Sequence, residues 1–262
     1  MQRFRCHNSL NDRSLDLELA APFPLGTVLY PGGFLPLRIF EVRYLDMIGK
    51  CHKTGAPFGV VALTEGVEVR RPARPNSPNS PSSPGAENAG GTGGASNSPG
   101  AAGPAGSTPP SGDGFANEAF NDMGTLATID ELTVPQPGLM VIRCTGMQRF
   151  EIARREKLKH GLWIADVTRL PDDQSIPIPD DLQRVADALG GVIKTLQSRG
   201  VPSAQMPLQP PFRLDDCAWV ANRWCELLPM PLSLKQRMMA LDNPLVRLEL
   251  VSDMLERTGI AT

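Results

Sequence analysis

Several features that would assign this 262-residue chain to a specialised class of protein are missing or scarce. Its five cysteines are too few, and odd in number, for a disulfide scaffold. The 26 Lys and Arg against 28 Asp and Glu give a formal charge of −2, which excludes a basic protein held on nucleic acid mainly by phosphate neutralisation. Apolar runs are too short to span a membrane, and residues 1–18 lack the apolar stretch of a signal peptide. We therefore expect a cytoplasmic protein with reduced thiols.

The common catalytic motifs are also missing from the sequence. Its one Gly-Lys pair, Gly49-Lys50, has no glycine five residues before Gly49, so there is no Walker motif. No Rossmann fingerprint, His-Glu-x-x-His, Cys-x-x-Cys or Gly-x-Ser-x-Gly occurs. These absences predict a chain that is not an enzyme and that has no cofactor, no metal and no catalytic residues.

A long segment of low complexity interrupts the first half. Pro72–Gly114 is 43 residues long, with 9 Pro, 10 Gly and 8 Ser, and it contains no Val, Ile, Leu, Met, Phe, Trp, Tyr or Cys. Such a segment cannot bury enough apolar area to offset its ordering entropy, so we expect it to be disordered. Strand-like sequence resumes soon after it, which favours an inserted loop, taken as 72–122, over a linker between domains.

Apolar runs bounded by Pro and Gly predict a β-rich first half. The expected strands are Phe23–Tyr30, Phe34–Leu37, Phe58–Leu63 with a polar continuation at 66–70, Thr125–Val134, Leu139–Cys144, Met147–Ala153 and Leu162–Leu170. Turns are expected after Tyr30, at Pro135–Gly138 and at Thr145-Gly146. Ile39–Ile48 has a helical period and would end at Gly49 or Gly55.

The period becomes helical after Pro179. Four helices are expected. The first is capped by Asp180 and Asp181 and ends at Gly200, and the second is capped near Asp215 and ends at Pro229. The third opens with a Ser233/Gln236 capping box and reaches Leu241, and the fourth runs from Asn243-Pro244 to about Arg257. We therefore expect a mobile tail at 1–18, a β-barrel half at 19–170 and a helical half at 171–262.

Some residues resemble fragments of a chemical site, although structural explanations are favoured for them. They are the pairs Cys6-His7 and Cys51-His52, the thiols Cys144, Cys217 and Cys225, the Asp pairs at 172/173, 180/181 and 215/216, and Trp219 with Trp224. Adjacent Cys and His are too close for two ligands of an ordinary zinc site. Two of the three Asp pairs lie at expected helix starts, where capping explains them, and the tryptophans suit helix packing. An enzyme site assembled from residues distant in sequence, one of these thiols included, stays open.

The opening of the β-rich half resembles the N-terminal, substrate-binding domain of Lon proteases. The resemblance is carried by Pro24-Leu25, Leu29-Tyr30-Pro31-Gly32, Leu35-Pro36-Leu37-Arg38-Ile39-Phe40-Glu41 with Arg43-Tyr44, and Phe58-Gly59-Val60-Val61. It continues in Gly124-Thr125-Leu126-Ala127, Gly146 with Arg149-Phe150, Ala165-Asp166-Val167 and Asn243-Pro244 with Arg247-Leu248-Glu249. It implies an α+β protein, with a PUA-like β pseudo-barrel followed by an α-helical bundle.

This resemblance also implies a function, the binding of unfolded or tagged polypeptides or of a protein partner. The chain ends about where that module would end, without ATPase motifs or a Ser-Lys protease domain, so we expect a stand-alone, non-enzymatic module in protein quality control or an adaptor. An apolar groove between barrel and bundle is the expected binding surface. The expected peptide-binding residues are Arg38, Phe40, Glu41, Tyr44 and Arg149. A structural alternative for Arg38 and Glu41 is pairing with each other or with backbone carbonyls.

RNA binding by a PUA-like module is the alternative function. Its one supporting feature is the basic side chains of the segment Arg149–His160, which a solvated hairpin tip would explain equally well. The overall charge of −2 and the two tyrosines argue against it. No membrane partner is expected, and the sequence does not give the oligomeric state.

Overall fold

A computed structural model describes residues 17–66, 118–202 and 205–259. Most of the expected insert, Cys6-His7 and the expected strand continuation from residue 67 lie outside these described residues. Strand β1 already begins at Leu17, within the expected tail, and strand β5 begins at Ala119, before the expected end of the insert. The described residues belong to one compact unit. None of its helices is both long and apolar enough to cross a membrane.

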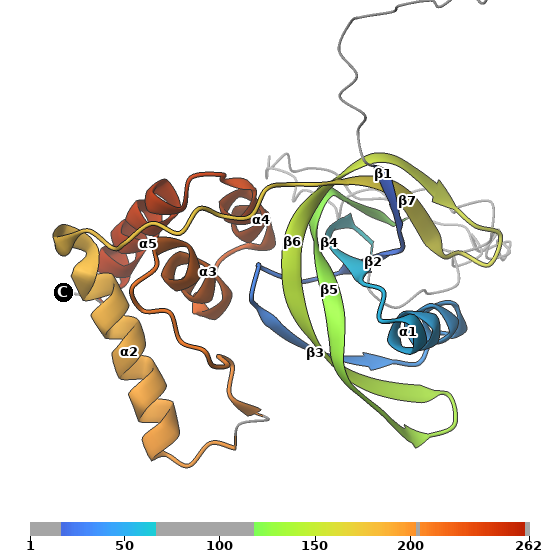
Figure 1. Cartoon of the computed structure of the whole chain (residues 1–262), viewed down its shortest axis with the longest axis horizontal. Coiled ribbons are helices and arrows are strands. Elements are labelled where there is room, and N and C mark those ends of the chain that lie inside the picture. The colour runs from blue at the N-terminus through green and yellow to red at the C-terminus, as the bar shows by residue number, and fades with distance from the viewer. Residues whose placement is uncertain (1–16, 67–117, 203–204, 260–262) are drawn as a thin grey trace, which may run out of the picture. The chain divides into compact units, whose positions relative to one another are not determined.

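Seven strands form one mixed sheet in the described part of the chain (Figure 1). They are β1 (Leu17–Ala20), β2 (Pro22–Leu25), β3 (Phe34–Ile39), β4 (Phe58–Glu65), β5 (Ala119–Gln136), β6 (Leu139–Lys157) and β7 (Trp163–Arg169). Their order is β1-β7-β6-β5-β4-β2, and β3 pairs with β6 beside this path. The outermost strands β1 and β2 are separated in sequence by Ala21 alone, so the sheet must curl until its two ends meet.

Strand β6 is continuous, which contradicts the turn expected at Thr145-Gly146. Gly146 lies against the tight turn that follows Tyr30: its carbonyl accepts from the amide of Gly32, and its amide donates to the carbonyl of Gly33, both at 2.8 Å. A Cβ on Gly146 would be 2.3 Å from the Tyr30 carbonyl oxygen. The glycine therefore permits close approach of two backbones within a strand rather than a change of direction.

Helix α1 (Val42–Thr54) follows β3 and starts later than expected, because Ile39 is the last residue of β3. Gly55, one of the two expected terminators, ends the helix in the left-handed conformation at φ 69°. Tyr44, Met47 and Ile48 are buried and pack into the barrel core. This core also holds Ile39, Phe23 and Leu25 of β2, and Phe58 and Val60 of β4.

The helical half contains a 3₁₀ turn (Asp180–Leu182), α2 (Gln183–Ser198), α3 (Cys217–Leu227), α4 (Leu232–Ala240) and α5 (Pro244–Thr258). Asn243 caps α5 as predicted by accepting from the amides of Leu245 and Val246. Asp216 caps α3, one residue beyond the expected position.

Two of the predicted helix caps are wrong. No side-chain cap hydrogen bond opens the 3₁₀ turn or α2, and Asp180 and Asp181 instead form the first turn. Helix α4 begins at Leu232, which places Ser233 inside the helix rather than at its cap. Gln236 donates from its amide to the Met123 carbonyl of β5 at 2.9 Å, so the expected capping-box residue joins helix to barrel. The seven strands and four later helices confirm the α+β prediction.

The helices share a core with the barrel. Trp219 and Trp224 are buried in it, as expected, and Trp224 donates its indole N–H to the Val185 carbonyl at 3.0 Å. Val28 and Tyr30 of the first half belong to the same apolar cluster. This apolar cluster contains residues from both sides of the expected boundary at 170/171. We therefore propose that 19–170 and 171–262 are subdomains that share a core and unfold together.

A polar network ties β6 to the helices. Arg149 on β6 is 3% exposed and donates to the Met239 carbonyl at 3.1 Å, while its guanidinium lies 3.3 Å from Asp173. Asp173 also accepts from Arg247 of α5 at 2.6 Å. One carboxylate therefore bridges a strand arginine and a helix arginine.

Candidate binding site

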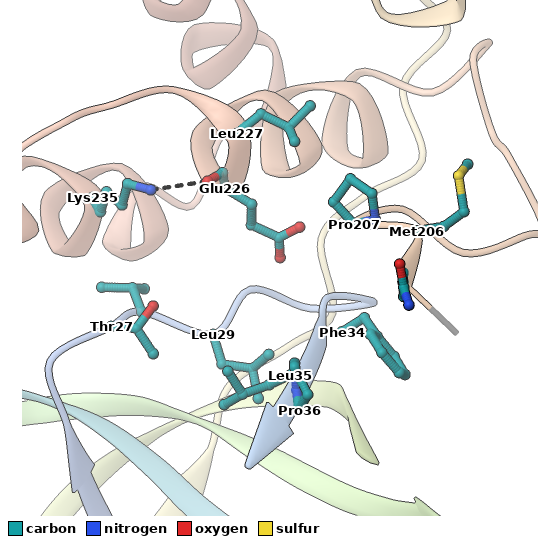
Figure 2. Close-up of a pocket in the computed structure, with 12 residues that line it drawn as sticks. Thr27, Leu29, Phe34, Leu35, Pro36, Met206, Pro207, Glu226, Leu227 and Lys235 are labelled. Carbon is teal, nitrogen blue, oxygen red and sulfur yellow. Dashed lines mark hydrogen bonds between the residues drawn. The ribbon is translucent and has the colours of Figure 1, made fainter. Parts of the chain in front are cut away.

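A cavity of about 360 Å³ lies where the barrel meets the helices. We call it the junction cavity. It is lined by Thr27, Val28, Leu29, Phe34, Leu35 and Pro36 from the barrel, Gln205, Met206 and Pro207 from the α2–α3 connection, Glu226 and Leu227 from α3, and Lys235 from α4. Figure 2 shows the Glu226 side chain extending from α3 toward the barrel segment.

The lining of the junction cavity is mostly apolar with two charged residues. Lys235 donates from Nζ to the Glu226 backbone carbonyl at 2.9 Å, drawn as a dashed line in Figure 2. Arg223 donates to Glu226 Oε1 at 2.8 Å and also to the Pro31 carbonyl at 3.0 Å. The first contact joins α4 to α3, and the second joins α3 to the turn that precedes β3. The helical side and the barrel side of the cavity are therefore held together by hydrogen bonds.

Burial raises the pKa of Glu226 from 4.5 to about 7, even though the cations Arg223 and Lys235 oppose the shift. A raised folded-state pKa means that the folded chain holds this proton more tightly than the unfolded chain. Stability from the protonated form is therefore complete below about pH 4.5 and is lost as the pH rises through about 7.

We expect Glu226→Gln to stabilise the protein mainly at high pH, because glutamine mimics the protonated carboxyl and retains an acceptor for Arg223. The expected gain in the free energy of unfolding is about 2–3 kcal/mol at pH 8 and below about 1 kcal/mol at pH 5. Urea denaturation at the two pH values measures it. The exposed Glu249→Gln serves as control, with expected changes below about 0.5 kcal/mol at both. Equal gains for Glu226→Gln at the two pH values would contradict the prediction.

Four of the five expected peptide-binding residues gather around a second cavity of about 260 Å³ in the barrel. We call it the barrel cavity, and its lining residues are Phe23, Leu25, Pro36, Leu37, Arg38, Ile39, Phe40, Glu41 and Tyr44. Arg38 is exposed and Phe40 is 52% exposed, whereas Tyr44 is buried with its ring centroid 4.0 Å from that of Phe23. Glu41 accepts from Arg43 at 3.0 Å, so the expected pairing of Arg38 with Glu41 is wrong.

Arg149, the fifth expected residue, is not part of either cavity's lining. Its guanidinium is buried and engaged by Asp173, Asp242 and the carbonyls of Met239 and Leu241. The basic excess of the surrounding segment is also partly neutralised, because Arg155 lies 3.1 Å from Asp122. Arg154 and Lys159 are exposed.

The thiols that invited a catalytic interpretation are held in their neutral form. Burial raises the pKa of Cys144 to about 12 and that of Cys225 to about 11, and it also raises the pKa of Cys217. A thiol with a raised pKa is a poor nucleophile at neutral pH. Within residues 17–66, 118–202 and 205–259, no three His, Cys, Asp or Glu side chains lie close enough together to hold a metal ion.

The residues that line the helical side of the junction cavity were not identifiable from sequence. Met206, Pro207, Glu226, Leu227 and Lys235 come from three separate segments, and none forms a motif with the others. The sequence predicted a groove between barrel and helices but named none of these residues.

The sequence matches the family described as ATP-dependent protease La (LON) substrate-binding domain over residues 21–257. This match spans most of the chain, and the protein therefore belongs to that family. No curated protein matches the sequence.

Two solved structures are similar to this chain. A Lon N-terminal domain protein from Xanthomonas campestris has 23% sequence identity and a TM-score of 0.59, covering 90% of this chain and 98% of its own. The N-terminal domain of the Mycobacterium avium complex Lon protease has 12% identity and a TM-score of 0.47, covering 90% and 97%. The first of these supports the assignment of the fold.

Proposed function

We propose that this protein binds polypeptide segments at the junction cavity and acts in protein quality control or as an adaptor, in the cytoplasm and without catalysing a reaction. The observation that carries the proposal is the cavity itself, where apolar side chains from both halves surround a few polar groups. Its volume of about 360 Å³ falls in the range of pockets that enclose small ligands or several side chains. Membership of a substrate-binding domain family supports a polypeptide as the occupant.

The arrangement suits a polypeptide that lacks a defined fold. Met206 and Leu227 offer adaptable apolar contacts, while the raised pKa of Glu226, about 7, lowers the cost of covering its carboxyl group. The four described cysteines are free thiols, as expected of a protein in a reducing compartment.

Fluorescence anisotropy with fluorescein-labelled, reduced and carboxymethylated α-lactalbumin tests the proposal. We expect wild-type protein to bind at tens of micromolar or below, and Pro207→Asp, which places a charge at an exposed position of the cavity lining, to weaken binding about tenfold. Val134→Asp is the matched control, because Val134 is 56% exposed on β5 and does not line the junction cavity. It should change binding less than about twofold.

Three results would contradict the proposal. The first is absence of binding to the unfolded protein at 50 µM, which is the upper end of the expected range of dissociation constants. The second is tight binding of a single-stranded RNA that Arg154→Ala abolishes and Pro207→Asp leaves unchanged, which would favour the RNA-binding alternative. The third is ATP hydrolysis or peptide cleavage by the purified protein.

A further inference from the structure

Strand β3 has a partner along only one of its two edges. Its six residues, Phe34–Ile39, pair antiparallel with Met140–Thr145 of β6. No other strand in the described part of the chain pairs with β3. At about 3.3 Å per residue, the unpaired edge is about 20 Å long, which is enough for a strand of about six residues.

The register identifies the backbone groups on this unpaired edge. Gly146 donates to the Gly33 carbonyl at 2.8 Å, and the Cys144 thiol points to the Leu35 carbonyl at 3.1 Å, so odd-numbered residues here direct their backbone groups to β6. Backbone direction alternates along an antiparallel strand. The groups of Phe34, Pro36 and Arg38 therefore face the unpaired edge. Proline at 36 agrees with this, since a strand tolerates proline where its missing N–H would face outward.

Both cavities lie along this edge. The junction cavity is lined by Phe34, Leu35 and Pro36, and the barrel cavity by Pro36–Ile39, so Pro36 belongs to both linings. Each cavity is lined by consecutive residues of β3, and consecutive side chains point to opposite faces of a strand. A cavity that is bordered by side chains of both faces lies beside the edge of the strand rather than over one face. Across from β3, Phe23 and Leu25 of β2 border the barrel cavity.

We propose that an extended polypeptide segment adds as a strand to the free edge of β3, with one end of the segment at the junction cavity and the other end at the barrel cavity. This proposal rests on the proposed function and specifies how the substrate is recognised. The main chain of the segment pairs with the backbone groups of Phe34, Pro36 and Arg38, which makes recognition largely independent of sequence.

The occupant is an apolar segment with an acidic residue. Apolar side chains suit the linings of both cavities. Arg38 is exposed at one end of the edge and has no ion-pair partner within the described ranges, so an acidic side chain of the segment would complement it. Such segments are exposed when an apolar strand of another protein unfolds.

Backbone methylation of a peptide tests strand addition directly. The probe is a fluorescein-labelled eight-residue peptide of alternating valine and threonine with one glutamate in place of a threonine, measured by anisotropy with the full chain. Methylating the amides of one alternate set removes the N–H groups of one peptide edge only. We expect one methylated set to weaken binding at least about tenfold and the other to change it less than about threefold.

A matched pair of variants tests the strand on the protein side. Arg38→Pro removes an amide that faces the unpaired edge and spares the pairing with β6, whereas Arg38→Ala keeps the amide and removes the side chain. We expect about threefold weaker peptide binding for Arg38→Ala, which loses the charge contact alone, and at least about tenfold weaker binding for Arg38→Pro, which loses the amide as well, with melting temperatures of both near wild type.

The outcomes separate this proposal from the proposed function. Equal effects of the two methylated sets, or equal effects of the two Arg38 variants, overturn strand addition while binding of unfolded α-lactalbumin stands. If wild-type protein binds neither the peptide nor unfolded α-lactalbumin at 50 µM, the proposed function fails as well.

Discussion

Replacing Arg247 by alanine is expected to lower the free energy of unfolding by about 3–5 kcal/mol. Arg247 is 1% exposed, and its guanidinium donates to Asp173 at 2.6 Å, to the side-chain oxygen of Asn222 at 2.7 Å and to the Met238 carbonyl at 3.0 Å. Removing it leaves the buried carboxylate of Asp173 with Arg149 as its remaining arginine partner and leaves several buried acceptors without this donor, which costs more than the ion pair itself contributes. Urea denaturation at pH 7 gives the change directly.

Arg184→Ala is the matched control for this prediction. Arg184 pairs with Glu256, but their side chains are 49% and 45% exposed. Water replaces such a pair readily, so the expected loss is below about 1 kcal/mol. Similar losses for the two arginine variants would show that the contacts of Arg247 contribute little to joining α5 to Asp173.

The second large effect is expected at Gly146, where alanine should lower the free energy of unfolding by about 3 kcal/mol. The new Cβ would lie 2.3 Å from the Tyr30 carbonyl oxygen and 3.0 Å from Leu29. Neither backbone can withdraw easily, because Gly146 exchanges two hydrogen bonds with the turn at Gly32 and Gly33. Leu29 also lines the junction cavity, so we expect peptide binding to weaken together with stability.

Gly191→Ala is the control, for which we expect the free energy of unfolding to rise rather than fall. Gly191 lies inside α2, and a Cβ there would meet nothing within 4 Å. Alanine is therefore expected to stabilise the protein by about 0.5–1 kcal/mol through helix propensity. A Gly146→Ala protein as stable as Gly191→Ala would contradict the close approach described for β6.

Local patterns in the sequence predicted those elements whose stability is local. The cap at Asn243 was predicted, and Gly55 was one of the two glycines expected to end α1, because each of these features depends on a few adjacent residues. The same local reasoning misread Gly146 as a turn and Ser233 as a cap. In both cases a contact with a distant segment decided the outcome: the Tyr30 turn at Gly146, and Met123 for Gln236.

The resemblance to a known family placed four candidate binding residues, Arg38, Phe40, Glu41 and Tyr44, along one cavity. They are close in sequence, so a shared motif brings them together. Arg149 is different, because its role depends on Asp173 and on the carbonyl of Met239, which lies 90 residues away. Its charge in the sequence gave no sign that it would be buried.

Composition and periodicity alone predicted a β-rich first half and four later helices, because those features depend on neighbours within one strand or helical turn. The junction cavity, the raised pKa of Glu226 and the open edge of β3 depend on segments that meet only after folding. Tyr30 and Lys235, joined by a 2.7 Å hydrogen bond, are 205 positions apart. No local pattern encodes such a contact, since it arises from how a barrel and a set of helices share one apolar core.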